Sequence, residues 1–457
     1  MSIHSPTRLE RSPLVPLILS LSLPVMVTLL VQAMYNFVDS IYVSRINEYA
    51  FTALSLAFPL QVLVTAVASG TGVGINVLVA RALGNKDREK ASSIATHGFI
   101  LAGINWVVFV VMGSLLIEPY FQILSASYQV EQMGRRYLQI VIFFSFGTFV
   151  ENIGIRILQA TGNMNKPMLY EVIGAVVNII LDPIMIFGLG SFPKLGVTGA
   201  AIATVMGQFV SMILVVWSIF RNDNNRIRIS FRRFRLSFKT SQYIYWASLP
   251  TIIMQSMCTV YITGLNAVAI HFTEAVVSVI GVYYKLQTFL LIPTYGINQG
   301  ITPLISYCYG ANNYQRIWNT LWYSTALSLV SLCFGTLIFW MFTPQLLNIF
   351  AATDEAVSIG IPALRIISTS FPFFVFTILN PTLFQSTGHI GKNIAVTIVR
   401  QIICLVPLAT LLSNFGLTYF WLTFPFSEII ATVLAFVYTH QLYKGSLSPH
   451  TEGTRKP

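Results

Sequence analysis

The chain has 457 residues, of which 55% are hydrophobic and only 9% carry a charged side chain, and its net charge is +11. A soluble domain carries about 25% charged residues, and a disordered chain combines low hydrophobicity with high charge, so both classes are excluded. The apolar runs are continuous rather than alternating, which also excludes a membrane β-barrel. The composition therefore predicts an all-α, polytopic membrane protein, in which each bilayer-spanning helix needs about 20 residues.

In chain order, the apolar runs predict twelve transmembrane helices joined by mostly short loops. The helices of the first half are expected at 14–38, 51–80, 94–117, 136–160, 168–189 and 195–220. Those of the second half are expected at 243–270, 276–306, 318–342, 360–386, 393–413 and 416–443. The first run is too long for the apolar core of a signal peptide and lacks a cleavage site, so it is interpreted as a retained helix.

These spans divide the chain into an N lobe (1–220), a basic linker (221–242), a C lobe (243–443) and a tail (444–457) that is expected to be disordered. The linker carries seven Lys and Arg residues. Between two membrane helices, such a run is typical of a cytoplasmic loop against anionic headgroups rather than of a nucleic-acid site. Of the 27 Lys and Arg residues, 19 fall on the side of the linker and both termini. This bias predicts that both termini are cytoplasmic.

The two halves of the chain are internal repeats. A shift of 226 residues places Ser22-Leu23-Pro24 on Ser248-Leu249-Pro250. The same shift superimposes Tyr35 on Tyr261, Gln61 on Gln287, Gly70 on Gly296, Gly74 on Gly300 and Gly162 on Gly388. Because six helices return the chain to its starting side, the halves are expected to form two pseudo-symmetric six-helix bundles of the same orientation. Transporters hold their substrate in a cleft between such bundles, and a duplicated scaffold such as a channel or receptor is the alternative.

Prolines and glycines within the predicted spans point to bending and to close packing of helices. Pro24 and Pro250 each remove a backbone hydrogen bond early in the first helix of a half, and Pro183 does so in the fifth helix. The glycines expected to bring helices close together are Gly70, Gly74, Gly296 and Gly300. They follow no strand, so they do not predict a nucleotide-binding loop.

Acidic residues inside the spans are the strongest candidates for a functional site, because a charge at membrane depth costs roughly 2.5–3.5 kcal/mol on insertion scales. Asp39 and Asp182 are expected at a similar depth, with Asn178 one helical turn before Asp182. Their oxygens suit Na⁺, and two neighbouring carboxyl groups can also share a proton. An Asp pair that caps broken helices is the structural alternative. The shifted positions in the second half are Leu265 and Leu408, so coupling is expected in the first half only.

Further polar residues within the spans are candidates for lining a substrate cavity. Lys285, in the middle of a span, is expected to line the cleft, pair with an acid or extend its amine to the interface. The full set is Tyr35, Asn36, Gln61, Tyr261, Lys285, Gln287 and Glu428. The sequence contains no hydrolase, kinase or metal-binding motif, and its four cysteines lie in or beside apolar runs. We therefore expect no enzyme activity, no catalytic residue, no metal and no cofactor.

Several motifs resemble the MATE (multidrug and toxic compound extrusion) family. They are Asn36-Phe37-Val38-Asp39 and the segments 159–167, 178–183 and 196–204. Tyr284-Lys285-Leu286-Gln287 is most similar to the bacterial MepA-like branch. The resemblance covers nearly the whole chain, in order and together with the duplication.

This resemblance implies the MATE fold of the MOP superfamily and a cation-coupled antiporter that exports amphipathic, mostly cationic drugs by rocking between two lobes. It assigns Asp39, Asn178, Asp182 and Thr204 to the cation-coupling site. The second half lacks acids that some sodium-coupled relatives carry, which favours H⁺ over Na⁺. It further implies a monomer in the bacterial inner membrane, with drugs and lipid as partners and no nucleic acid. The alternatives are a lipid or metabolite exporter of the same superfamily and an uncoupled channel or receptor.

Overall fold

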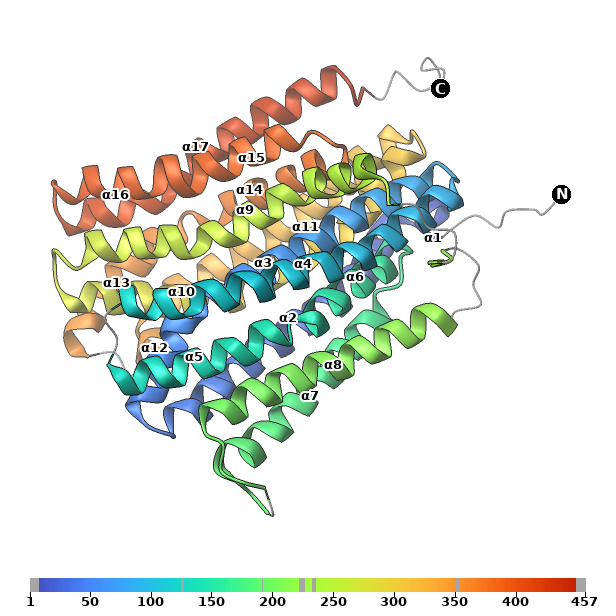
Figure 1. Cartoon of the computed structure of the whole chain (residues 1–457). Helices are drawn as coiled ribbons and strands as arrows, with labels where there is room; N and C mark the ends of the chain where they lie inside the picture. The colour runs from blue at the N-terminus through green and yellow to red at the C-terminus, as the bar shows by residue number, and fades with distance from the viewer. Residues whose placement is uncertain are drawn as a thin grey trace. The chain divides into compact units, whose positions relative to one another are not determined.

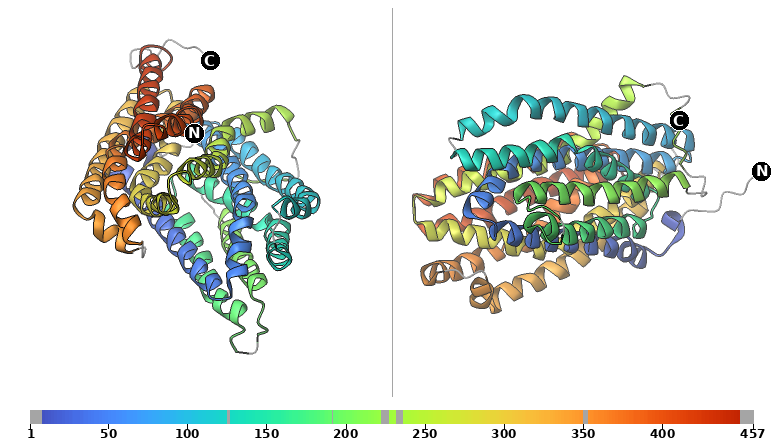
Figure 2. Two further views of the ribbon diagram at one scale, coloured as in Figure 1. Left: turned by 90° about the vertical axis from the view of Figure 1, so that its left-hand side faces the viewer. Right: turned by 60° about the horizontal axis from the view of Figure 1, so that its bottom comes forward.

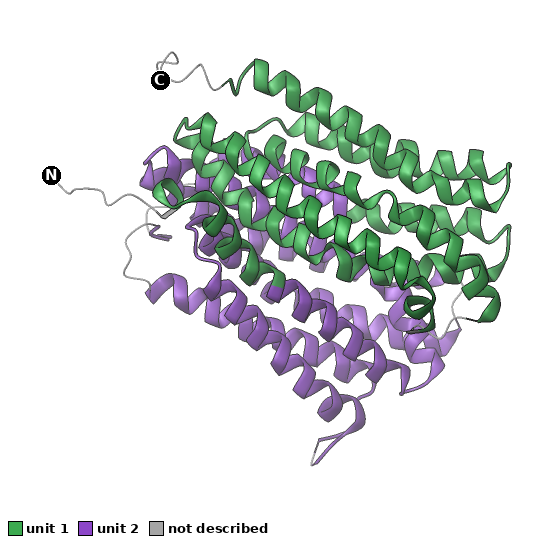
Figure 3. Ribbon diagram, turned by 180° about the vertical axis from the view of Figure 1, so that it is seen from behind, with its two compact units in different colours: residues 1–26, 256–457 green, residues 27–255 purple. Residues whose placement is uncertain are grey.

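The computed structural model describes residues 8–124, 127–190, 192–221, 227–231, 236–349 and 353–448, and all regular secondary structure in these ranges is helical (Figure 1). The chain forms two compact units (Figure 3). Unit 1 comprises Met1–Met26 and Ser256–Pro457, and unit 2 comprises Val27–Gln255.

Unit 2 contains the later spans of the first half of the chain. Its helices are α3 (Glu48–Gly84), α4 (Arg88–Ile123), α5 (Tyr128–Phe143), α6 (Phe146–Ala160), α7 (Asn165–Phe187) and α8 (Val197–Arg221). Helices α7 and α8 lie side by side along most of their lengths (Figure 1, Figure 2). The helix α2 (Leu14–Ser44) begins in unit 1 and ends in unit 2.

Unit 1 contains the corresponding helices of the second half. They are α10 (Glu274–Gly310), α11 (Tyr314–Met341), α12 (Thr343–Ile349), α13 (Asp354–Ser368), α14 (Phe371–Ser386), α15 (Ile390–Ile398), the π-helix η1 (Val399–Cys404), α16 (Leu405–Ser413) and α17 (Leu417–Lys444). The short α1 (Arg8–Arg11) also belongs to unit 1, and α9 (Phe238–Ala269) begins in unit 2 and ends in unit 1.

The predicted number of spans is confirmed. In the described residues, ten helices are long and apolar enough to cross a membrane, and two bent helix pairs bring the number to twelve. The fourth and tenth spans, expected at 136–160 and 360–386, are longer than predicted and are broken, with bends of 45° between α5 and α6 and 48° between α13 and α14. At these breaks, the hydroxyls of Ser145 and Ser370 donate to the carbonyls of Ile142 (2.8 Å) and Ile367 (2.6 Å). Such side-chain bonds compete with the helical pattern, and hydropathy does not reveal them.

The internal repeat is confirmed in the backbone. Lys86 and Asn312, which are 226 positions apart, both have a positive φ, of 61° and 55°. This conformation is uncommon for residues other than glycine. The next residues, Asp87 and Asn313, each accept a backbone N–H three residues later at 2.9 Å and so cap the following helix. The two halves therefore share the same turn as well as the same helix order.

The described parts of the linker and the tail pack against helices. Ile227 and Ile229 contact the apolar core of unit 2, and the Ser237 backbone N–H donates to His97 Nε2 at 3.1 Å. In unit 1, Leu447 is fully buried and its carbonyl accepts from Trp318, so the expected disorder does not begin at residue 444. Most of the basic linker residues and positions 449–457 lie outside the described residues.

In unit 1, the first part of α2 packs against two of the repeated glycines. Gly296 and Gly300 on α10 face Met26 and Ser22, and a Cβ atom at either glycine would collide with these residues. The contact places the beginning of the chain in the unit formed by the second half. This division differs from the expected lobes, 1–220 and 243–443.

In unit 2, the first part of α9 packs against the equivalent glycines. Gly70 and Gly74 on α3 face Ile252 and Ser248, which are the shifted counterparts of Met26 and Ser22. The helices α2 and α9 continue through Pro24 and Pro250 and pass from one unit to the other a few residues later. Each half of the chain thus supplies the beginning of its leading helix to the unit built mainly by the other half.

Substituting Gly74 tests this packing. In Gly74→Ala, the new Cβ would meet the Ser248 side chain and, at 2.7 Å, the backbone oxygen of Ile244, which cannot rotate away. Overpacking of this kind costs about 1–3 kcal/mol, so we expect a melting temperature several degrees lower in detergent. Gly103→Ala is the matched control, because a Cβ at Gly103 has no neighbour within 4 Å. Equal melting temperatures for the two variants would contradict the close contact.

Candidate functional site

The core of the candidate site is a polar cluster on the fifth and sixth spans of the first half. Asn178 and Asp182 lie one turn apart on α7, and Thr204 faces them from α8. All three are buried, with exposed fractions of 4%, 0% and 7%. Gly207 makes this proximity possible, because a Cβ at this position would lie 3.1 Å from the Asn178 Cβ.

The cluster contains more acceptor oxygens than donors. The Asn178 Nδ2 donates to Asp182 Oδ1 at 3.4 Å and to Thr204 Oγ1 at 3.5 Å, both long contacts. The second oxygen of Asp182, the Asn178 Oδ1 and one Asp39 oxygen are buried and have no hydrogen-bond partner among the described residues. Asp39 lies close enough to Asp182 for the two charges to interact. Buried acceptors are costly to leave unpaired, so this set of oxygens fits a bound proton or a small hard cation.

Two tyrosines and a glutamine surround Asp39. The hydroxyl of Tyr137, on α5, donates to the Gln61 Oε1 at 3.3 Å, and Tyr35 lies near both Asp39 and Tyr137. Tyr137 was not predicted as a site residue, because the predicted fourth span begins at residue 136 and leaves Tyr137 at a helix end. Since α5 begins at Tyr128, Tyr137 in fact lies within the helix. Asn36, on the neighbouring part of α2, is exposed.

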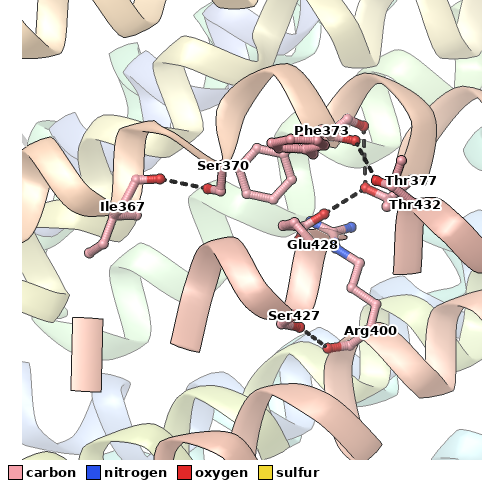
Figure 4. A network of polar contacts seen from close by, with 9 residues as sticks. Ile367, Ser370, Phe373, Thr377, Arg400, Ser427, Glu428 and Thr432 are labelled. Atoms are coloured by element: carbon pink, nitrogen blue, oxygen red, sulfur yellow. Dashed lines mark hydrogen bonds and ion pairs between the residues drawn. The ribbon is translucent and has the colours of Figure 1, made fainter. Parts of the chain in front are cut away.

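Glu428 belongs to a separate network in unit 1. It is 5% exposed, and each of its carboxylate oxygens has a partner. Oε1 accepts from Arg400 Nε at 2.5 Å, and Oε2 accepts from the Thr377 hydroxyl at 2.8 Å. Figure 4 shows the carboxylate between Thr377 and the Arg400 guanidinium. Glu428 is therefore neutralised within its own unit.

Arg400 is the residue of this network that sequence analysis left without a role. It lies on the π-helix η1, and the Ser427 hydroxyl donates to its carbonyl at 2.8 Å. The guanidinium stacks over the Phe374 ring, 4.8 Å from its centroid. π-Helical turns occur frequently at functional sites. The available signal in the sequence was that Arg400 is one of only five Lys and Arg residues inside the predicted spans, and one of these, Arg136, is the first residue of its span.

The other predicted cavity residues of unit 1 lie on α9 and α10. Tyr261 packs against Tyr284, with 6.1 Å between ring centroids, and its hydroxyl lies 3.4 Å from the Cys258 sulfur. Lys285 is exposed and Gln287 is half-buried. The cavity itself stays a prediction. In the described part of the chain, no group of three or more His, Cys, Asp and Glu side chains is placed to hold a metal, and the expected lack of a cofactor also stays a prediction.

Comparison with known proteins decides the family. The model of the MatE family matches residues 24–184 and 250–411, which are the two repeats and most of the chain. The chain belongs to the MATE family. Members of this family are transporters, so the chain is a multi-pass membrane protein built for transport.

The names of its relatives in this family refer to different transported compounds. The chain is 23% identical to a FAD transporter of Shewanella oneidensis over 88% of each protein. It is 24% identical to the probable multidrug resistance protein NorM of Thermotoga maritima, covering 89% of this chain and 88% of the relative. The multidrug export protein MepA of Staphylococcus aureus is 22% identical over 90% of each chain, in line with the resemblance to MepA.

Solved MATE structures share the whole fold. An outward-facing multidrug resistance MATE transporter of the MOP superfamily aligns with a TM-score of 0.91 and 26% identity, covering 98% of this chain and 99% of that chain. A MOP superfamily transporter from Pyrococcus furiosus Vc1, whose reversed binding-pocket polarity suggests a different function, aligns with a TM-score of 0.89 at 26% identity and covers 96% and 98%. The predicted fold class is therefore confirmed.

Cation binding at the Asp182 cluster is testable by thermal melting. A ligand bound only by the folded protein stabilises it by about 2.7 kcal/mol at a concentration of a hundred times its Kd. The wild-type melting temperature in detergent should therefore rise with added Na⁺ or with falling pH, and Asp182→Asn should flatten that response. Glu118→Gln is the control, because Glu118 is 57% exposed and pairs with Arg135 outside the cluster. An unchanged response in Asp182→Asn would contradict the site.

Proposed function

We propose that this MATE transporter is a cation-coupled antiporter that exports amphipathic organic compounds by alternating access. The observation that carries the proposal is the group of unpaired buried oxygens from Asp39, Asn178 and Asp182 in unit 2. A cation that enters this group satisfies acceptors that the described residues leave unpaired. Asp39, Asn178, Asp182 and Thr204 are the residues proposed to hold the coupling cation.

The coupling cation proposed is H⁺ rather than Na⁺. The second half of the chain places Leu265 and Leu408 where the first half has Asp39 and Asp182, and its embedded acid, Glu428, is already paired with Arg400. Coupling therefore rests on the carboxyl pair of unit 2, and two neighbouring buried carboxyl groups favour sharing one proton over both being charged. A charge that crosses roughly 100 mV releases about 2.3 kcal/mol, enough to support a gradient of about fifty-fold.

The proposed setting is the bacterial inner membrane, with both termini in the cytoplasm and a single chain as the working unit. The excess of Lys and Arg on the side of the linker and the termini supports this orientation. The proposed cargo includes amphipathic cationic drugs. The names of the NorM and MepA relatives, a probable multidrug resistance protein and a multidrug export protein, support drugs as cargo.

A metabolite exporter is the second candidate function. The relative from Shewanella oneidensis is named a FAD transporter, and FAD is an aromatic anion rather than a cation. The observation in this chain that favours such cargo is Arg400, a guanidinium held inside unit 1. The two candidates share the same fold and coupling site and differ in the charge of the compound carried.

Dye transport in proteoliposomes tests the coupling. With a fluorescent amphipathic cation as cargo, an imposed pH gradient should drive wild-type transport, whereas Asp39→Asn and Asp182→Asn should lower the gradient-driven rate at least about tenfold, because an amide cannot bind the proton. Imposing a Na⁺ gradient instead of the pH gradient distinguishes the two ions. Glu118→Gln, an exposed acid outside the cluster, serves as the matched control.

Two results would contradict the proposal at different levels. Wild-type transport that ignores both gradients would remove the antiporter mechanism and favour an uncoupled channel. Gradient-driven transport that survives both Asp substitutions would leave the function intact but reject the residues assigned to the cation.

A further inference from the structure

The charges well inside the predicted spans of the two units have opposite net signs. In unit 2, the acids are Asp39, Glu151, Glu171 and Asp182, against Arg156. In unit 1, the bases are Lys285, Arg365 and Arg400, against Glu428. Lys285 and Arg365 are exposed, so Arg400 is the base that lies inside unit 1. Embedded charges are costly and mark ion and substrate pathways. Unit 1 is therefore suited to a different chemical group from the cation that fits unit 2.

The Arg400 guanidinium has N–H donors that are not used by Glu428. Its Nε donates to Glu428, but neither terminal Nη nitrogen has a hydrogen-bond partner among the residues that the structure describes. The side chain keeps 15% of its surface exposed, although the residues around it are largely buried. Arginine carries N–H donors on all three nitrogens and has no acceptor, so the Nη side of this guanidinium is an unfilled binding edge.

The surroundings of this edge are aromatic. Phe374 lies against the guanidinium, and Tyr261 and Tyr295 are close enough to interact with it electrostatically. Nearby, the Tyr284 ring packs 5.0 Å from Tyr283, and its buried hydroxyl has no partner among the described residues. A guanidinium edge matches the two oxygens of a carboxylate or phosphate, and aromatic rings provide stacking surfaces for a flat compound.

We propose that Arg400 is a substrate-recognition residue that binds the oxyanion group, a carboxylate or phosphate, of an aromatic compound. Glu428 is a positioning residue, because it holds Nε and leaves the Nη edge free. A cationic group gains little from Glu428, since Arg400 already neutralises its charge and each of its oxygens already has a donor. This inference rests on the proposed export function. It adds that unit 1 selects a negatively charged group on the exported compound.

A matched pair of dyes provides the test. Rhodamine 6G is a cationic ester, and its free acid has the same ring system with a carboxylate in place of the ester. Fluorescence anisotropy with the purified full-length protein measures the Kd of each dye. The readout is the Kd for rhodamine 6G divided by the Kd for its free acid. Binding of rhodamine 6G itself shows that a variant is folded, so a change in the ratio reports recognition of the carboxylate.

The variants are chosen so that a merely structural ion pair would give a different result. In Arg400→Gln/Glu428→Gln, two amides can replace the pair without leaving a buried charge, and we expect the preference for the free acid to fall about tenfold, the size of one lost charged hydrogen bond. In Glu428→Gln, the Arg400 charge is no longer neutralised, and we expect the preference to rise. Arg400→Lys keeps the charge but lacks the planar edge, so it should restore only part of the preference.

Arg365→Gln is the control, because it removes one exposed positive charge from unit 1 that does not pair with Glu428. Its dye ratio should equal that of the wild type. The inference is overturned if the double variant keeps the wild-type ratio, if Glu428→Gln lowers it, or if Arg365→Gln lowers it as much as the double variant does. Failure of the wild type to bind either dye would instead overturn the proposed export function, and this inference with it.

Discussion

Polar groups inside an apolar protein need partners, and this requirement organises both units. In unit 1, both oxygens of the Glu428 carboxylate have a partner, because Arg400 and Thr377 each donate to one of them. In unit 2, the Asn178 amide donates only over long distances, and acceptor oxygens of Asp39 and Asp182 stay unpaired in the described residues. A fully hydrogen-bonded ion pair stabilises one arrangement, whereas acceptors without a hydrogen bond are available to a ligand. The same physical rule thus separates a carboxylate that is already paired in unit 1 from the unpaired carboxyl oxygens of unit 2, where we propose the cation site.

The duplicated halves use equivalent helices to reach these different results. In the first half, the polar residues come from the fifth and sixth spans, α7 and α8, and in the second half Arg400 and Glu428 also lie on the fifth and sixth spans. The π-helix η1 occupies positions that correspond, at the shift of 226, to residues 173–178 of the regular helix α7. An added residue in a helical turn rotates the side chains that follow. The repeats have therefore kept their backbone turns and changed the chemistry of one helix pair.

Much of this architecture was predictable from the sequence, since apolar runs locate spans and a constant offset locates the repeat. The proximity of Asp39 and Asp182 also followed from their expected depth, whereas their binding role stays a prediction. The bends at Ser145 and Ser370 were not predictable, because the apolar runs continue through both positions and do not show where a hydroxyl bonds to the helix backbone. Arg400 was missed for a related reason. Hydropathy identifies a charge within a span, but its partner, 28 positions along the chain, is set by packing.

The exchange of leading helix segments between the units has a consequence for how the molecule is made. The first part of α2 is synthesised long before residues 256–457, yet it belongs to the unit that these residues complete, where Gly296 and Gly300 contact Met26 and Ser22. That segment can make this contact only after α10 has been synthesised. The first half translated alone would lack the α9 segment that packs on Gly70 and Gly74. Neither half of the chain thus contains all the segments of one unit, so each unit is completed by a segment from the other repeat.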